Sequence, residues 1–377
     1  LSDYLAVNFV DRVFNNPNLF TGFENLSALF LYSLQVYADF SGYTDIAIGV
    51  AMLMGFYLPK NFDSPYKATN PGNFWKRWHI SLSNWLKDYL YIPLGGNRKG
   101  TFAGYFILTL IAGIIVFLSN NLWVGGIIVF ITLLILFSGI FIPKTRKAIN
   151  TNINLMNTML LGGLWHGASW NFMIWGGLNG VGILIFKFWK NLSNIWKSII
   201  TLLLVDLFIL LNFYYPHPAW VIGIVWSGII FFGTLLSTIY NAIFKKHPLP
   251  LINRGWSIFL TFIFITFTRL FFRSGSNLNP AEANATAWNT AKTMVARIGS
   301  TWDFSKIPEI IQNYLFIFLL FIGGMIIHWL PEKWKKWYRI NFAMTPLWVQ
   351  AIVVIAVVFI VYQFITADLQ PFIYYQF

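Results

Sequence analysis

The sequence predicts an all-α protein that crosses a membrane in about 8–10 segments. Of its 377 residues, 57% are hydrophobic and only 10% are charged, whereas soluble domains carry roughly 25% charged residues. Several apolar runs reach the length of about 20 residues that a helix needs to span a bilayer. The short alternating segments typical of a membrane β-barrel are not visible. These observations indicate a polytopic helical membrane protein.

The charge of the chain points to an inner (cytoplasmic) membrane. The net charge is +13, and the basic residues lie in short loops between apolar runs, as the positive-inside rule requires. The lipid bilayer is therefore an expected partner, and nucleic acid is not. The chain has no cysteine, so it can form no disulfide, thiolate nucleophile or cysteine-bound metal site.

Residues 1–377 are expected to form a single integral-membrane domain. No internal repeat or low-complexity segment divides them. The chain begins with Leu1 rather than methionine and shows no signal peptide, so we expect N-terminal helices to be missing from it.

The first two segments are predicted to be an interfacial helix and a long apolar helix. Residues 1–22 mix apolar and polar side chains and end in a turn, which is typical of a helix at the membrane surface. Within the apolar residues 25–58, Asp39 and Asp45 lie six apart and therefore on different helical faces. Gly42 between them is a candidate break. Each carboxylate is expected either to hydrogen-bond a helix end or neighbour, or to act at the reaction centre.

Residues 59–100 are predicted to lie on the cytoplasmic side, because seven basic residues there face only two acidic ones. Residues 73–79 mix aromatic and cationic side chains, which suits the level of the lipid headgroups. Residues 80–91 continue as a helix. The loop at 93–98 carries glycines and a basic side chain that can receive a phosphate-bearing donor, although a plain cytoplasmic loop explains the same residues.

The remaining segments follow from the basic clusters and polar turns. Arg269 and Arg273 lie at the outer end of their segment, against the charge rule, so Arg269 is expected to point inward. The longest polar loop, residues 274–307, is placed outside. The predicted segments are 102–119, 122–142, 152–186, 198–215, 219–243, 255–272, 310–330 and 346–366.

Residues 152–186 are flanked by basic clusters on both sides, so they make an even number of passes. Thirty-five residues are too few for two full spans and a loop. A re-entrant or broken helix around residues 162–167 fits this length. Non-helical backbone at membrane depth is tolerated only inside protein or beside a watery cavity. His166 is therefore placed deep in the membrane, at the turning point.

His166 is the predicted catalytic residue. An ionisable residue at membrane depth is costly and is taken as functional by default. The glycines at 162, 163 and 167 indicate a tight or broken backbone around it. Imidazole has an unperturbed pKa of about 6.5, which suits acid–base catalysis. A neutral His166 can take the proton from an acceptor hydroxyl while that hydroxyl attacks a thioester.

The residues alone favour other histidines and other reaction classes less. His217 and His247 lie in loops, His328 lies near the cytoplasmic end of a span, and His79 borders the cytoplasmic interface, so packing or incidental roles explain them. Metal binding is not favoured, because no second histidine or carboxylate falls at ligand spacing on one helix. A serine nucleophile elbow is absent. Proton-coupled transport stays open, since transporters also place single ionisable groups near the midplane.

Long ordered motifs cover much of the chain: LQVYADFSGYTDIA at 34–47, NFDSPY at 61–66, FWKRWHISLS at 74–83, WLKDYLYIPLGGNR at 85–98, GLWHGA at 163–168, FFR at 271–273 and PFIYYQF at 371–377. They resemble the membrane-bound O-acyltransferase family, in the bacterial branch that contains alginate O-acetyltransferases and the teichoic-acid D-alanyl transfer protein. Similar proteins often carry arginine where Lys76 and Lys87 stand, which keeps the charge. They also carry additional N-terminal membrane helices.

The resemblance implies an acyltransferase, most simply an O-acetyltransferase, that acts on hydroxyls of an exported or cell-envelope polysaccharide such as alginate. It implies His166 as the essential histidine of the Trp-His-Gly motif and His79 as a second catalytic histidine in or near the cavity. We expect direct transfer with His166 as general base, while His79 orients a group or donates a proton to the leaving group. A covalent acyl-histidine intermediate would use the same residues.

The donor is expected to be a cytoplasmic thioester, either acetyl-CoA or an acyl carrier protein, and no cofactor is expected to stay bound. An extracytoplasmic partner transferase can complete the transfer to the polysaccharide acceptor. The alternative is a transmembrane acyl transporter that hands acyl groups to such a transferase. A third hypothesis is a non-catalytic assembly scaffold. Substrate or donor binding is assigned to Lys76, Arg77, Trp165, Asn97, Arg98 and Asp39.

Overall fold

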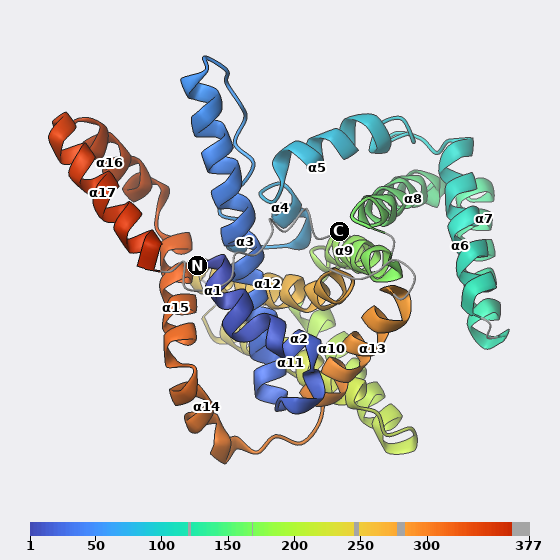
Figure 1. Cartoon of the computed structure of the whole chain (residues 1–377). Helices are drawn as coiled ribbons and strands as arrows, with labels where there is room; N and C mark the ends of the chain where they lie inside the picture. Colours follow the sequence, from blue (N-terminus) through green and yellow to red (C-terminus); the bar gives the residue numbers. More distant parts are fainter. Residues whose placement is uncertain (120–121, 168, 245–248, 277–282, 364–377) are drawn as a thin grey trace.

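The protein is described by a computed structural model that covers residues 1–119, 122–167, 169–244, 249–276 and 283–363. These residues form helices joined by turns and loops, with no strand among them, so the predicted all-α fold is confirmed (Figure 1). The α-helices are α1 Ser2–Leu5, α2 Asp11–Asn15, α3 Gly22–Leu53, α4 Pro71–Trp75, α5 Ile80–Leu86, α6 Phe102–Ser119, α7 Leu122–Phe141, α8 Pro143–Leu164, α9 Trp170–Trp189, α10 Asn194–Tyr214, α11 Pro218–Ile243, α12 Pro250–Ser274, α13 Ala283–Ile298, α14 Ile307–Asn313, α15 Leu315–Trp329, α16 Glu332–Ala343 and α17 Leu347–Gln363. Short 3-10 or π-helical segments are η1 Ala6–Val10, η2 Pro17–Leu19, η3 Pro65–Lys67, η4 Lys87–Tyr91 and η5 Phe304–Lys306.

The long helix α3 runs through the centre of the molecule (Figure 1). It begins at a capping box, in which the Thr21 hydroxyl accepts from the N–H of Glu24 and the Glu24 carboxylate accepts from the N–H of Thr21. The helix continues without interruption past Gly42, so the candidate break there is not formed. A lone glycine costs a helix only about 1 kcal/mol, and α3 is supported by contacts with α1, α12, α13 and α15.

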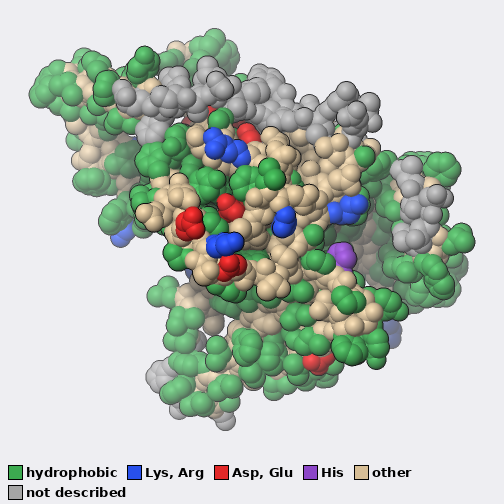
Figure 2. Space-filling view, turned by 60° about the horizontal axis from the view of Figure 1, so that its bottom comes forward, with side chains coloured by type: hydrophobic (Ala, Val, Ile, Leu, Met, Phe, Trp, Pro, Cys, Tyr) green, Lys and Arg blue, Asp and Glu red, His purple; other side chains and the backbone are tan. Residues whose placement is uncertain are grey.

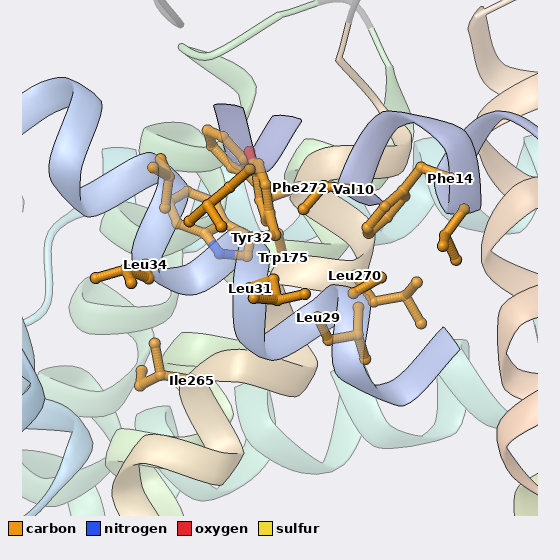
Figure 3. Close-up of a cluster of buried hydrophobic side chains, with 14 of the residues drawn as sticks. Val10, Phe14, Leu29, Leu31, Tyr32, Leu34, Trp175, Ile265, Leu270 and Phe272 are labelled. Atoms are coloured by element: carbon orange, nitrogen blue, oxygen red, sulfur yellow. The ribbon is translucent and has the colours of Figure 1, made fainter. Parts of the chain in front are cut away.

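A hydrophobic core forms where α3 meets α12, α9 and the N-terminal helices (Figure 3). Its buried side chains include Tyr32 of α3, Leu270 of α12 and Trp175 of α9. Because lipid is as apolar as these side chains, close packing and interhelical hydrogen bonds stabilise such a core more than apolar burial does. Ser33 and Thr266 supply one such bond between α3 and α12, with their hydroxyl oxygens 3.1 Å apart.

The N-terminal residues are part of this core, which differs from the surface helix expected over residues 1–22. The segments α1 and η1 bury Leu5 and Phe9 completely or nearly so. Asp11 of α2 forms an ion pair with Arg273 of α12, with Oδ1 and Nη2 2.7 Å apart. Arg269 is only 4% exposed, so the prediction that it points inward is confirmed.

The segment expected as an outer loop contains a buried helix, α13. Ala287, Ala291 and Met294 are almost fully buried, and α13 packs against α3, α11 and α12. These three residues recur at i, i+4 and i+7, which is one face of a helix. The polar residues between them obscured this pattern, because their composition resembles that of a loop.

Four helices of the described chain, α9 to α12, are long and apolar enough to cross a membrane. A fifth candidate is the pair Phe304–Asn313 and Leu315–Trp329, which is bent by 82°. Three shorter apolar helices lie at Phe102–Phe117, Gly125–Phe141 and Leu347–Tyr362. The expectation of about 8–10 segments counted these shorter helices and more polar stretches as well. The chain is a multi-pass helical membrane protein.

Two helix pairs project from the body of the molecule, α6 with α7 and α16 with α17 (Figure 1). Large apolar side chains on them are exposed, among them Phe130 of α7 and Ile355 of α17. Figure 2 shows charged side chains gathered near the middle of one face, with hydrophobic side chains dominating toward the edges of the view. Such a distribution is expected where outer helices face lipid.

Candidate active site

The hairpin of α8 and α9 positions His166. The helix breaks between α8 and α9, at the place predicted from the charge pattern. Gly163 and Gly176 let the two helices touch, because a Cβ on Gly163 would lie 2.3 Å from the carbonyl oxygen of Phe172. The tight backbone that the glycines predict around His166 is therefore confirmed.

The turn itself is fixed by a backbone hydrogen bond, by Gly167 and by a helix cap. The N–H of His166 donates to the carbonyl oxygen of Gly163 at 3.0 Å. A Cβ on Gly167 would lie 2.7 Å from the ring of Phe172, so glycine fits there best. The Ser169 hydroxyl then caps the N-terminus of α9. These contacts hold the imidazole in one place.

The His166 side chain is buried among aromatic rings, with 6% of the residue exposed. The rings of Trp165, Trp175 and Phe272 meet it edge-on, with centroids 5.0, 5.2 and 5.1 Å from its own. Trp165, a predicted binding residue, is itself 53% exposed. It packs against the imidazole but is not among the residues that line the cavity described below.

His79 lies between α4 and α5, close enough to His166 for the two imidazoles to interact electrostatically. Its backbone is left-handed, with φ 44°, which costs a residue that carries a Cβ roughly 1–2 kcal/mol. Strain of this kind concentrates at functional sites. The ring packs edge-on against Phe40 of α3 at 4.7 Å. Burial lowers the pKa of His79 to about 4, so its imidazole is neutral at physiological pH.

A cavity of about 370 Å³ lies beside His166, walled by α5, η4, α8 and α9. Lys76, Lys87 and Tyr91 contribute polar groups to it, and Trp175 contributes an aromatic surface. A mostly apolar pocket with a few convergent polar groups is typical of a small-molecule site. Two lysines beside a buried imidazole can receive an anionic ligand that carries a reactive group.

Two helical faces form most of the cavity wall, and the sequence spacing of each could have revealed it. On each face five of the lining residues fall at i, i+3, i+4, i+7 and i+11, which is the periodicity of one side of a helix, while Leu82, Leu86 and Gly163 line the cavity beside them. Apart from His166, these residues were not predicted to share a site, because the two stretches were considered separately, as a loop helix and a membrane span, and their helical faces were not compared. The faces are Ile80, Ser83, Asn84, Lys87 and Tyr91, and Leu155, Thr158, Met159, Gly162 and His166.

Of the predicted binding residues, Lys76 lines the cavity. Arg77 instead forms an ion pair with Asp63, with Nη1 and Oδ2 2.9 Å apart. Although burial raises the pKa of Asp63, the cations Lys60 and Arg77 outweigh this effect and hold that pKa below its usual range. Asp39 is half-buried on α3 and lies outside the lining of this cavity. Arg77 therefore stabilises the segment before His79 through its ion pair with Asp63, and it does not line the cavity.

The glycine loop at 93–98 is not shaped as a phosphate cradle. The N–H groups of both glycines donate within the turn, to carbonyl oxygens at 2.9 Å, so they do not face a ligand. Asn154 of α8 anchors the loop through a bond from its Nδ2 to a loop carbonyl at 3.0 Å. Asn97 accepts from the Tyr91 hydroxyl at 2.7 Å, and Arg98 is exposed. Asn97 is thus a hydrogen-bond partner of the cavity residue Tyr91 and does not line the cavity itself.

Two further histidines have structural partners. His217 caps α11 by accepting from the N–H of Ala219 at 3.2 Å, and the buried His328 accepts from the N–H of Tyr66 at 3.2 Å. His247 lies outside the described residues. Among the residues that are described, no three histidine, aspartate or glutamate side chains are grouped as metal ligands.

The fold and this site define a multi-pass helical membrane protein with a buried histidine at the wall of a cationic cavity. Residues 4–114, which include His79, match the model of the membrane-bound O-acyltransferase family. This match confirms the family resemblance for the motifs between residues 34 and 98, and the motifs at 163–168, 271–273 and 371–377 lie beyond the matched residues. Two parts of those motifs, Ala168 and residues 371–377, lie outside the described residues.

Curated relatives match about half of the chain. It is 41% identical over 185 residues to the probable alginate O-acetylase AlgI of Pseudomonas putida and 33% identical over 216 residues to the peptidoglycan O-acetyltransferase of Helicobacter pylori. It is 26% identical over 198 residues to the teichoic acid D-alanyltransferase of Bacillus subtilis. These matches cover 49%, 57% and 50% of this chain but 28%, 32% and 40% of the relatives. The matched part is therefore less than half of each relative.

Proposed function

We propose that the chain forms part of a membrane O-acyltransferase that moves an acyl group, in the simplest case acetyl, from a cytoplasmic thioester toward hydroxyls of an exported or cell-envelope polysaccharide. The observation that carries this proposal is the buried His166 at the wall of a cavity that also holds Lys76 and Lys87. The relatives are named for alginate, peptidoglycan and teichoic acid, which supports an acceptor in the cell envelope and a bacterial cytoplasmic membrane as the location.

His166 acts as the general base in this proposal. A hydroxyl oxygen of the acceptor attacks the thioester carbonyl carbon, His166 takes the hydroxyl proton, and the C–S bond breaks as the thiolate leaves. The thiolate then receives that proton, so the products are an ester and a thiol and the imidazole is neutral again. The aromatic rings around His166 keep water from hydrolysing the donor. A covalent acyl-histidine route would use the same imidazole.

Lys76 and Lys87 are proposed to receive the negative groups of the donor. CoA and the prosthetic arm of an acyl carrier protein both carry phosphate, which a lysine binds as a point charge. Both lysines are exposed at the rim of the cavity. The contact of Lys87 with Asp88 at 3.3 Å is solvent-exposed and therefore weak, so it leaves the lysine able to bind a phosphate.

Replacement of His166 tests the catalytic assignment. In the full-length protein, His166→Ala is expected to lower acyl transfer roughly 10²–10⁴-fold, the usual contribution of a general base. Transfer of a radiolabelled acetyl group to the polysaccharide is measured, and thermal unfolding in detergent checks that the variant folds. His217→Ala is the matched control, because His217 caps α11 and should leave transfer unchanged. If the folded His166→Ala protein transferred acetyl groups at the wild-type rate, the catalytic assignment of His166 would be rejected.

A second candidate, an acyl transporter that serves a separate extracytoplasmic transferase, is favoured by one contact. Asn284 Oδ1 of α13 accepts from the N–H of Trp170 at 2.7 Å, so the segment that the charge pattern places outside reaches the turn that carries His166. Vesicles with the donor inside and a hydroxyl acceptor outside distinguish the two functions. Ester formation by the full-length protein alone supports the transferase, whereas labelled acyl groups that cross without esterification support the transporter.

A further inference from the structure

We propose that Asn61 is a positioning residue for His79, which it holds in the tautomer that carries its proton on Nδ1. The lone pair of Nε2 is then the basic site of this histidine. The tautomer follows from hydrogen bonds in the loop that precedes α5. It does not depend on which reaction the protein catalyses. What the lone pair does in catalysis rests on the acyl transfer proposed above.

The orientation of the Asn61 amide is settled by a backbone group. The N–H of Ser81 points at Oδ1 of Asn61, with the nitrogen and oxygen 3.1 Å apart. A backbone N–H can only donate a hydrogen bond, so the atom that faces it must be the amide oxygen and not the amide nitrogen. An amide flip is ordinarily ambiguous, but here the main chain resolves it.

The same oxygen decides which nitrogen of His79 carries the proton. Nδ1 of His79 lies 3.3 Å from Asn61 Oδ1, and an amide oxygen accepts but cannot donate. Nδ1 must therefore donate. The Ser81 hydroxyl is 3.0 Å from Asn61 Oδ1 and 3.4 Å from His79 Nδ1, so its hydrogen goes to the nearer oxygen. The Ser81 hydroxyl oxygen is then left with lone pairs that face the Nδ1–H of His79.

A neutral imidazole has only one N–H, so Nε2 of His79 is left without a proton. Burial keeps this ring neutral at physiological pH. In the resting protein His79 is therefore set to accept a hydrogen bond or a proton, and it can donate a proton through Nε2 only after receiving one. This sharpens its proposed role: it orients a hydroxyl first, and acts as an acid only after protonation.

Asn61 can act in this way because its own position is fixed on both sides. Only 9% of the residue is exposed, and its carbonyl oxygen accepts from the N–H of Ile80 at 2.9 Å. The N–H of Asp63 donates to the carbonyl oxygen of Arg77, also at 2.9 Å. The segments around Asn61 and His79 are thus paired through their backbones, and this pairing supports the left-handed conformation at His79.

Nitrogen NMR on histidine tests the tautomer directly. The full-length protein, labelled with ¹⁵N-histidine in lipid bilayers, should show a neutral His79 with its proton on Nδ1, assigned by loss of the signal in His79→Gln. Asn61→Leu, which cannot accept a hydrogen bond, should lose the uniform Nδ1–H signal, and Asn61→Asp, which still accepts, should keep it. A wild-type His79 protonated on Nε2 would overturn the inference, even if no variant folded.

Kinetics then separate a positioning role from a merely structural one. Asn61→Leu is expected to lower kcat at least roughly tenfold, less than the loss of a general base, while KM for the thioester stays near the wild-type value and Asn61→Asp restores part of kcat. Asn70→Ala is the matched control, because Asn70 caps α4 through its side chain and should keep kcat. An Asn61→Leu protein with unchanged kcat would reject the role of Asn61.

The two proposals can fail independently. If His166→Ala retains transfer while His79 carries its proton on Nδ1, the acyl-transfer mechanism is wrong and the role of Asn61 in fixing the tautomer stands. If His166→Ala abolishes transfer while His79 is protonated on Nε2, the mechanism stands and the role of Asn61 is wrong.

Discussion

Arg269 is a buried cation whose described partners are neutral. It lies on α12 with 4% of its surface exposed, and its Nη1 donates to the carbonyl oxygen of Ser33 and to the hydroxyl of Tyr66. The guanidinium stacks over the ring of Trp78, 4.4 Å from its centroid, which is a cation–π contact. Trp78 directly precedes His79, so Arg269 supports the loop that holds the second histidine.

We predict that Arg269→Lys destabilises the protein, because an ammonium cannot both stack on Trp78 and reach the two acceptors. The expected loss is roughly 1.5–3 kcal/mol, the range for a hydrogen bond to a charged group. It is measured as a lower Tm in detergent. Arg254→Lys on the same helix is the control, since Arg254 is exposed and should leave Tm unchanged. An equal Tm for both variants contradicts this account of Arg269.

His79 also makes stability depend on pH in a stated direction. Its pKa is lowered by burial from 6.5 to about 4 in the folded protein. Between these values the unfolded chain binds a proton that the folded chain does not, so the free energy of unfolding falls as pH falls from about 6.5 to about 4, by up to roughly 3 kcal/mol. Above pH 6.5 His79 adds no pH dependence.

The measurement is the difference in Tm between pH 7 and pH 5 for the wild type and for His79→Gln. We expect the wild type to lose more, because the glutamine variant has no proton to bind at this position. The other four histidines are present in both proteins, so the difference between the two losses is assigned to His79. Equal losses in the two proteins would show that His79 is not buried in its neutral form.

At the scale of the helix pair, the crossing of α8 and α9 is predicted to tolerate no extra carbon at Gly163. A Cβ there would lie 2.3 Å from a backbone oxygen of Phe172, and backbone cannot move aside as a flexible side chain can. Gly163→Ala should therefore lower stability by roughly 1–3 kcal/mol, as overpacking does. It should also lower acyl transfer, because His166 lies in the turn that this crossing shapes.

The matched control is Gly228→Ala on α11, where nothing lies within 4 Å of the added carbon. Alanine is a better helix former than glycine by roughly 0.5–1 kcal/mol, so this variant should be as stable as the wild type or more stable. Tm and transfer of labelled acetyl groups are measured for both variants. A Gly163→Ala protein that matches the control in both measurements would rule out the close crossing.

Helical elements could be predicted where their hydrophobic pattern was strong. The break between α8 and α9 was predicted because two basic clusters required an even number of passes over a short length. The helix α13 was missed because its buried face consists of small residues such as Ala287 and Ala291 among polar ones. Composition averages over both faces of a helix, whereas packing selects one.

The whole molecule brings together four segments that are far apart in the chain. The loops that precede η3 and α5, the turn before α9, and α12 meet around the two histidines, through contacts such as Arg269 on Trp78 and Phe272 against His166. Such contacts are set by how the helices cross. Their partners could not be inferred from one sequence, because neither the spacing nor the chemistry of one segment names the other.

Local chemistry was enough to predict the helical membrane class and to single out His166 as the candidate catalytic residue, because hydrophobic length and the cost of an ionisable group at depth are properties of single segments. Packing was needed to show the rest. It pairs Arg77 with Asp63 across two loop segments, and it lines one cavity with Lys87 and Tyr91 together with residues of α8 and α9. Both results depend on which segments meet in the folded chain, and that is settled by how the helices pack against one another.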